Sequence, residues 1–396
     1  MAALTEAPYY DLLDPEQQAD AERTFAHLRK ETSVTRTPLG AGVIRREAAI
    51  QVLTDPRLVS SLPHLVRLQG VTDGVLHDMI ASSVIAVDGT DHTRLRRMVS
   101  RAFTPRAASR HRPEMRRLAE ELVDGFAAEG SCEFTADFAD RYPVQVICEV
   151  LGVPRSDHEA FARWGDSLTY VLSLELGGHR SEVEDAAEAL HTYVSELVAD
   201  RRARPRDDLV TELVGAVEDG DRLSETELFS MIGGLLFAGY DTTRNQLGQA
   251  MVAFASHPDQ WEILRSRPEL IPAAVNEVMR LVGAVSDIPR VATEDLEIDG
   301  WAIPAGTLVI VSLASANRDE TLSDDPIRFD IAAPRTGHVT FGAGPHYCLG
   351  ANLARAEMEE ALVVLSARLP DLRLDGEVVW RQGTGIAGPT RLPLAW

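Results

Sequence analysis

The sequence has little lysine and little cysteine. Lys30 is the single lysine among 396 residues, which leaves almost no candidate for a Schiff-base enzyme or for a phosphate-binding loop that depends on lysine. The three cysteines, Cys132, Cys148 and Cys348, are odd in number and far apart. This usage argues against a secreted disulfide framework and for a reducing compartment, so we expect the protein in the cytoplasm.

The chain also lacks a long hydrophobic run and an excess of positive charge. Its N-terminus, MAALTEAPYYDLLDPEQQ, is acidic, and its longest apolar run, MIGGLLFAGY, is too short to cross a bilayer. The formal net charge is -22, which has the wrong sign for binding nucleic acid or an anionic membrane. We therefore expect neither of these partners.

What the chain does have is enough apolar material for a large core, with 45% hydrophobic residues and no repeat or Gly/Ser linker. We expect a single domain over 1–396. Apolar residues at helical spacing dominate and predict a mainly α fold with a minor β region. The predicted helices are 106–128, 138–152, 155–173, 180–202, 225–256, 268–282 and 351–368. The predicted strands are the short segments VTRT, GVIRR, RVAT, LEIDGWAIPAGTLVIVS and RLPLAW.

The helix predicted over 225–256 is unusually long and polar at its centre. Ser224 and Glu227 have the spacing of a capping box at its start, and at about 1.5 Å per residue it would be roughly 48 Å long. Its middle reads LLFAGYDTTRNQ. Polar residues inside an apolar helix are costly unless they have partners, so we expect something in the fold to compensate for them.

The segment FGAGPHYCLGANLAR places Cys348 between a glycine-rich turn and the helix predicted over 351–368. At a helix N-terminus a sulfur meets free backbone N–H groups, which lower a thiol pKa and stabilise the thiolate. Gly350 has no side chain, which lets a flat, bulky partner approach the backbone. Such a thiolate is a nucleophile or a metal ligand, although a buried structural cysteine is the alternative.

These residues resemble the haem-binding loop of the cytochrome P450 family. The match covers Phe341, Gly344, His346, Cys348 and Gly350, and the resemblance extends over nearly the whole chain, in the pattern of the soluble actinobacterial branch. It implies the P450 fold, with the long helix crossing above the haem, and haem b as the cofactor, with Cys348 as the axial iron ligand. One departure is local: after ANRD the family commonly has Pro and an aromatic residue, where this chain has Glu320 and Leu322.

Three further motifs carry the resemblance. AGYDTT resembles the oxygen-activation motif, which places Ala238 and Gly239 beside the haem and makes Asp241 and Thr242 a catalytic acid-alcohol pair that relays protons. A kinked core helix with a satisfied threonine is the alternative. The expected haem propionate partners are His92, Arg96, Arg290 and His346, and the expected structural network is Glu277, Arg280 and Arg328.

The resemblance implies a monooxygenase that inserts one oxygen atom from dioxygen into a hydrophobic small molecule, by hydroxylation or epoxidation. Electrons would come from a ferredoxin and its reductase, because the chain has no flavin or Fe–S motif. The basic stretch over 94–117 is a candidate docking surface for the donor, or else an ordinary solvated helix face. Tailoring of a secondary metabolite such as a polyketide or a carrier-protein-bound acyl group is the expected role. The candidate substrate-binding residues, which could equally be core, are Leu235, Val285, Asp287, Ile288 and Ile386.

Three other functions fit parts of the same pattern. A peroxide-driven haem-thiolate oxidase acting on fatty acids would need no redox partner, although the Asp241–Thr242 pair favours dioxygen activation. A non-catalytic haem-binding sensor would need Cys348 but not that pair. A cysteine hydrolase using Cys348 and His346 is disfavoured, because two residues apart on a turn is a poor geometry for a nucleophile and its base.

Overall fold

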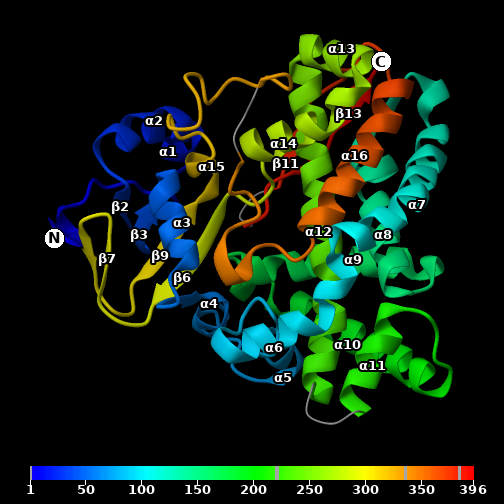
Figure 1. Cartoon of the computed structure of the whole chain (residues 1–396), viewed down its shortest axis with the longest axis horizontal. Helices are drawn as coiled ribbons and strands as arrows, with labels where there is room; N and C mark the ends of the chain where they lie inside the picture. Colours follow the sequence, from blue (N-terminus) through cyan, green and yellow to red (C-terminus); the bar gives the residue numbers. More distant parts are fainter. Residues whose placement is uncertain (1, 219–222, 334–336, 382–384) are drawn as a thin grey trace.

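Helices make up most of the molecule and pack around one long helix, α12 (Glu225–Ser256). The computed structural model describes residues 2–218, 223–333, 337–381 and 385–396. Figure 1 shows the helical part on one side and the strands near the N-terminus on the other, with α12 running through the middle. The predicted fold class, mainly α with a minor β region, is confirmed.

Two predicted helices have the bounds that the apolar spacing indicates, namely α12 and α16 (Ala351–Arg368). Others differ at their ends, because turns of 3-10 helix flank α9, and a short π-helix (Thr135–Ala139) precedes α8. The remaining helices are α1 (Pro15–Ala19), α2 (Ala21–Glu31), α3 (Arg46–Thr54), α4 (Leu62–Leu68), α5 (Gly74–Ala81), α6 (Gly89–Val99), α7 (Pro105–Asp124), α8 (Tyr142–Leu151), α9 (His158–Leu168), α10 (Arg180–Ala203), α11 (Leu209–Glu218), α13 (Pro258–Ser266), α14 (Ile271–Leu281) and α15 (Leu313–Ala316).

The largest sheet has five strands in the order β2-β3-β9-β6-β4, antiparallel except for the β3–β9 pair. Smaller sheets have the orders β1-β8-β7, β10-β13-β5 and β11-β12. The strands are β1 (Ala2–Ala3), β2 (Val34–Thr37), β3 (Gly40–Val43), β4 (Leu58–Ser60), β5 (Ser131–Glu133), β6 (Asp287–Ala292), β7 (Leu296–Ile298), β8 (Trp301–Ile303), β9 (Leu308–Ser312), β10 (Arg373–Leu374), β11 (Val379–Trp380), β12 (Pro389–Arg391) and β13 (Pro393–Ala395).

The strand predicted for GVIRR is wrong in its second half. The strand β3 ends at Val43, and Arg46 already begins α3. By contrast, VTRT is β2, and LEIDGWAIPAGTLVIVS forms β7, β8 and β9. The turn between β7 and β8 is made by Asp299 and Gly300, both with positive φ, the backbone conformation that a tight hairpin turn requires.

The helix α12 is fixed at its start and packed along its length. Ser224 Oγ accepts a hydrogen bond from the N–H of Glu227, and the Glu227 carboxylate accepts one from the N–H of Ser224. The predicted capping box is therefore present. Buried residues of α12 belong to a helical core that α7, α8, α10, α14 and α16 complete, while a second core lies under the five-stranded sheet. The Cys348 loop lies where these two parts meet.

Candidate active site

Cys348 lies immediately before α16, as the sequence predicts. Its backbone N–H donates to Phe341 O at 2.8 Å, which closes the loop, and α16 begins at Ala351 with Gly350 as its N-cap. The Cys348 side chain is exposed, and the N–H of Gly350 interacts with its sulfur. A Cβ atom built on Gly350 would meet open space. The loop therefore presents a sulfur beside room for a large partner.

The pKa of the Cys348 thiol differs from the sequence expectation. Desolvation by the surrounding loop raises this pKa, although the side chain has accessible surface, whereas Gly350 N–H, Arg96 and Arg355 act to lower it. The hydrogen bond from Gly350 at the start of α16 therefore does not outweigh desolvation. A bound metal ion would favour the thiolate, because coordination deprotonates a thiol outright.

Two histidines predicted to contact haem propionates lie against each other. The rings of His92 and His346 have centroids 4.1 Å apart. His346 Nε2 is 2.8 Å from Asp88 Oδ1, and Asp88 Oδ2 accepts the backbone N–H of Ser60. His92 is buried, and its Nε2 has no hydrogen-bond partner within the described residues. Desolvation, with His346 and Arg96 nearby, lowers the pKa of His92 to about 4.

Two arginines complete this cluster. Arg96 donates to the carbonyl of Tyr347, next to Cys348, at 2.5 Å. Arg290 is buried, and the one hydrogen bond of its side chain in the described part of the chain is a long one, 3.4 Å, to Pro289 O. Desolvation lowers the pKa of Arg290, and Asp88 acts against this. A buried guanidinium with so few acceptors is costly, so the cluster is built for an anion.

These residues fit a haem. The cluster offers an orphaned imidazole nitrogen and an under-satisfied guanidinium, which suit the propionate carboxylates. The exposed sulfur of Cys348 and the open space at Gly350 suit the iron and the porphyrin plane. Within the described residues these groups have few partners or none, and a bound haem would supply more.

Phe341 and Gly344 support the loop itself. The guanidinium of Arg355, on the first turns of α16, lies 4.4 Å from the centroid of the Phe341 ring, a position that sequence reasoning missed. Gly344 has φ +69°, and a Cβ there would lie 2.5 Å from Leu53 O of α3. The missing side chain of Gly344 thus allows the turn to pack against α3, and its contact with haem stays a prediction.

The oxygen-activation segment is on α12. Ala238 is exposed in the middle of this otherwise buried helix, which marks the face of α12 that borders an open space. Thr242, one turn later, is half-buried, and its Oγ1 donates to Ala238 O at 3.0 Å. The missing side chain of Gly239 does not lie on this face, because a Cβ on it would lie 2.6 Å from Ile147 of α8. The missing side chain of Gly239 allows α8 to approach α12, and the place of Gly239 beside the haem stays a prediction.

Asp241 does not contact Thr242. Its carboxylate is fully buried and accepts hydrogen bonds from Thr169 Oγ1 at 2.8 Å, Arg381 Nη1 at 2.9 Å and Asn245 Nδ2 at 3.0 Å. The side chains of these two neighbours have different hydrogen-bond partners, and their role as an acid-alcohol pair stays a prediction. The partners of Asp241 are the compensation that the polar centre of α12 requires.

Sequence reasoning missed Thr169, Arg381 and Asn245 for different reasons. Asn245 lies four residues after Asp241 on the same helix, and this spacing was a readable signal. Thr169 and Arg381 are 72 and 140 residues from Asp241, and no local pattern connects them to it.

Glu277 and Arg280 form the expected ion pair on α14. Both side chains are about 2% exposed, with contacts of 2.7 and 2.8 Å, and Arg280 also donates to the carbonyls of Asn317 and Pro326. The backbone carbonyl of Arg328 accepts a hydrogen bond from Arg280 at 3.3 Å, and its guanidinium lies 3.6 Å from Asp330. The structural role of Arg328 in this network stays a prediction.

Glu320, where the sequence departs from the family pattern, binds an arginine from another part of the chain. Arg29 of α2 is buried and donates two hydrogen bonds of 3.1 Å to the Glu320 carboxylate. A bidentate pair of this kind fixes the segment in place.

The candidate substrate residues come from separate parts of the fold. Val285 and Ile386 pair through an isolated β-bridge, and Leu235 lies on α12 one turn before Ala238. Ile288 is half-buried, within 3.6 Å of a Cβ built on Gly342. Asp287 has an exposed side chain that accepts from Ser286 Oγ at 2.7 Å, and desolvation raises its pKa. The Asp287 carboxyl therefore lies in a recess of the surface.

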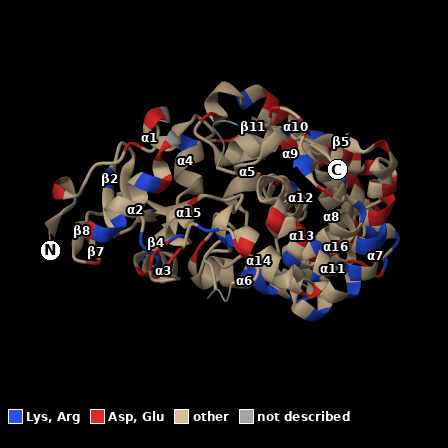
Figure 2. Ribbon diagram, turned by 90° about the horizontal axis from the view of Figure 1, so that it is seen from above, with Lys and Arg blue, Asp and Glu red and all other residues tan. Residues whose placement is uncertain are grey.

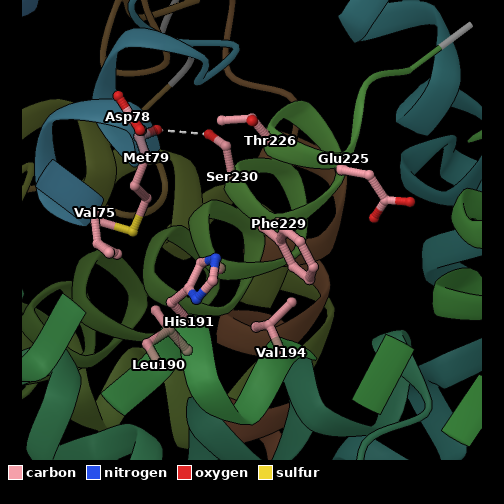
Figure 3. A pocket seen from close by; sticks show the side chains of 11 residues that line it. Val75, Asp78, Met79, Leu190, His191, Val194, Glu225, Thr226, Phe229 and Ser230 are labelled. Atoms are coloured by element: carbon pink, nitrogen blue, oxygen red, sulfur yellow. Dashed lines mark hydrogen bonds between the residues drawn. The ribbon is translucent and has the colours of Figure 1, made fainter. Parts of the chain in front are cut away.

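A separate cavity of about 170 Å³ lies near the N-terminal end of α12. Figure 3 shows its lining, which comes from α5, α10 and α12. Ser230 Oγ donates to Met79 O at 2.6 Å, and the rings of His191 and Phe229 are 4.8 Å apart. Its lining along α12 ends at Gly233, before the exposed Ala238, so the cavity is distinct from the Cys348 loop.

The comparisons with known proteins agree with this site. The family model for cytochrome P450 matches residues 70–365. Mycinamicin IV hydroxylase/epoxidase of Micromonospora griseorubida is 40% identical over 360 residues (89% of each chain), and luteothin monooxygenase of Streptomyces thioluteus is 37% identical over 392 residues (98% of this chain, 95% of that one). The solved structure of P450BioI with a fatty-acid-ligated acyl carrier protein has a TM-score of 0.90 at 30% identity, covering 96% of this chain and all of that one.

This chain therefore belongs to the cytochrome P450 family, and it is an oxidoreductase of the monooxygenase type that uses dioxygen and a haem-thiolate cofactor. The fold is the P450 fold. Among the described residues, no helix is both long and apolar enough to span a membrane.

Proposed function

We propose that this protein is a haem b monooxygenase that hydroxylates or epoxidises a hydrophobic intermediate of secondary metabolism, such as a polyketide or a carrier-bound acyl group. One observation carries the proposal: a cysteine sulfur at the start of α16 lies in the same loop as His346 and beside the under-satisfied His92 and Arg290. The named activities of the relatives support the class of substrate.

The residues of this chain would hold the haem at both ends. Cys348 would ligate the iron, while His92, Arg96, Arg290 and His346 would bind the two propionates. When bound, a haem with a thiolate ligand supplies the capacity to activate dioxygen and cleave its O–O bond. Phe341 would support this loop, because the guanidinium of Arg355 lies over its ring.

Thr242 would hold a proton donor on the side of α12 that faces the open space. Its Oγ1 donates to Ala238 O, which leaves the lone pairs of the hydroxyl free to accept a hydrogen bond from water. A hydroxyl in this position keeps a water molecule aligned for proton transfer, and such alignment contributes about 10² to 10⁴ in rate.

The electron donor would bind on the cysteine side, and we propose a ferredoxin supplied by its reductase. In the stretch 94–117, Arg112, Arg116 and Arg117 pair with glutamates. Arg97, Arg101, Arg106 and Arg110 are exposed and have no ion pair within the described residues. Asn352 of α16 donates to Phe103 O, which ties this basic surface to the Cys348 helix. Figure 2 shows ribbon positions of Lys and Arg (blue) around α6 and α7. An acidic donor suits this surface.

The substrate wall would be apolar with one polar recess. Leu235, Val285, Ile288 and Ile386 would contact a hydrophobic ligand, and Asp287 would orient a polar group on it. A carrier-bound substrate is distinguished from a free acid by affinity: binding of the acyl-carrier form at least about tenfold tighter than that of the free acid would support the carrier-bound version. Equal affinities would exclude it.

The experiment that tests the proposal is the spectrum of the purified protein, ferric and then reduced under carbon monoxide. A red-shifted Soret band is expected, and substrate is then sought through the spin-state change on binding. Thr242→Ala should retain this band and the binding of substrate while releasing more of its electrons as peroxide. Full turnover with peroxide alone would favour the peroxide-driven alternative, and an unaltered function in Thr242→Ala would favour the sensor.

A further inference from the structure

The cavity between α5, α10 and α12 is separate from the haem site, because its lining on α12 ends at Gly233. Its volume is about 170 Å³. An apolar cavity of about 150 Å³ binds one benzene molecule. The cavity is therefore large enough for a six-membered ring with a short substituent.

The inner part of the cavity is apolar. The hydroxyl of Ser230, which also lines it, is already bonded, since it donates to Met79 O at 2.6 Å. Side chains of this kind suit a hydrocarbon ring, because burial of apolar surface drives its binding. The buried and half-buried apolar residues of the lining on α5 and α10 are Val75, Met79, Leu190 and Val194.

The rim of the cavity is acidic. Asp78 of α5 and Glu225 of α12 are exposed and belong to the lining. Asp78 pairs with His77 at 3.1 Å, and Glu225 pairs with Arg202, which comes from outside the lining. The described lining includes neither lysine nor arginine. Two carboxylates on different helices therefore give the rim a negative potential, which attracts a cation and repels an anion.

Two rings in the lining also suit a cation. The rings of His191 and Phe229 have centroids 4.8 Å apart, and Figure 3 shows Val75 and Met79 on the other side of His191. The His191 imidazole makes no hydrogen bond within the described residues. A neutral imidazole has one nitrogen that accepts a hydrogen bond, and the face of a Phe ring attracts a positive charge.

We propose that this cavity is a binding site for a small organic cation, an ammonium group on an apolar body of about six to eight carbon atoms. The apolar body would lie among the side chains of α5 and α10, and the ammonium group would lie at the rim near Asp78 and Glu225. Because α5, α10 and α12 all line the cavity, the bound cation would contact three helices and stabilise the folded state. The site needs neither substrate nor turnover.

The test is a fluorine NMR titration of the full-length holoenzyme with para-fluorobenzylammonium. The haem iron is held as its carbon monoxide complex, so that the amine cannot ligate it. The ammonium ion should bind at least about tenfold more tightly than the uncharged para-fluorobenzyl alcohol, and para-fluorobenzoate should bind more weakly than either. Equal affinities for the ammonium ion and the alcohol, or tighter binding of the benzoate, would overturn the proposal.

Variants separate the charge of the rim from the shape of the cavity. The double variant Asp78→Asn, Glu225→Gln should bind the ammonium ion about tenfold more weakly and the alcohol as the wild type does. Val75→Phe fills the cavity and should abolish the binding of both. Asp73→Asn is the matched control, because Asp73 is exposed and directly precedes α5 but is outside the lining.

Each variant also has a result that contradicts the site. Unchanged binding of the ammonium ion in Val75→Phe would place the ligand elsewhere on the protein. Unchanged binding in the double variant, or an equal loss in Asp73→Asn, would show that the two rim carboxylates do not recognise the cation. The double variant keeps the shape of the side chains, so it tests the proposal even where Val75→Phe does not fold.

Discussion

Two groups of buried charged side chains serve different purposes in this protein. Glu277 and Arg280 on α14 bind each other, and the carbonyls of Asn317 and Pro326 satisfy the rest of the guanidinium. In the second group, Arg290 has one long hydrogen bond, and His92 Nε2 has none within the described residues. A complete set of partners indicates a role in the fold, and an incomplete set indicates a ligand that supplies the missing partners.

The assignment of His92 and Arg290 to a haem depends on Cys348 as the ligand of the haem iron. Cys348→Ser should lose the red-shifted carbon monoxide band, and monooxygenation should fall by roughly three orders of magnitude, the scale seen when an essential group is removed. The control is Cys132→Ser, because burial raises the pKa of the Cys132 thiol to about 12 and keeps it protonated. A Cys348→Ser enzyme with the wild-type band would contradict the assignment.

The buried Glu277–Arg280 ion pair should contribute to the free energy of unfolding. Replacing Glu277 by Gln should lower the free energy of unfolding by about 3 to 5 kcal/mol, because it leaves a buried guanidinium without its counter-charge. Urea unfolding measures this loss. Arg117→Gln removes an exposed pair with Glu114 and Glu121 and should cost at most about 1 kcal/mol. Equal losses in the two variants would mean that burial of the pair has no special effect.

Arg290, whose side chain has too few acceptors, should affect haem binding and not the stability of the haem-free chain. Arg290→Gln should weaken haem retention by about 10 to 100-fold, the value of a charge-assisted hydrogen bond to a carboxylate. The transfer rate of haem to an acceptor protein measures this change. The haem-free variant should be at least as stable as the haem-free wild type, because a poorly satisfied buried charge has been removed. A destabilised haem-free variant would show that Arg290 belongs with the structural pair.

His338 is a third case for this comparison. Its Nε2, like that of His92, lacks a hydrogen-bond partner within the described residues, but His338 is outside the propionate cluster. Desolvation, with Arg355 nearby, lowers its pKa to about 4 from 6.5. Below pH 6.5 the unfolded chain takes up a proton that the folded chain does not, so stability is lost as the pH falls from 6.5 toward 4, by about 3 kcal/mol. His338→Gln should remove this part of the pH dependence, and a pH profile identical to the wild type would show that His338 titrates normally.

Local sequence was sufficient for features that depend on neighbouring residues. The bounds of α12 and α16 follow from apolar spacing, the Ser224–Glu227 capping box and the breaking residues around them. The position of Cys348 at the start of α16 follows in the same way. The helices at the N-terminal side, such as α3, were missed because their apolar faces are short and resemble strand segments.

The roles of single residues required the fold. Gly239 and Gly344 were assigned to the haem from their place in motifs, but the atoms that their missing side chains would meet belong to Ile147 and Leu53. Asp241 was paired with its neighbour Thr242, whereas its carboxylate is held by Thr169 and Arg381 from distant segments. Side-chain direction depends on packing, and packing brings together residues that the sequence separates.

The sequence by itself indicated the class of this protein, because a cysteine at a helix start, a polar break in a long helix and a spaced set of arginines and histidines are local motifs that resemble those of the family. The tertiary structure decided which of these groups are satisfied and which need a ligand. The physical reason is that the cost of a buried polar group depends on every partner around it, and most of those partners come from elsewhere in the chain.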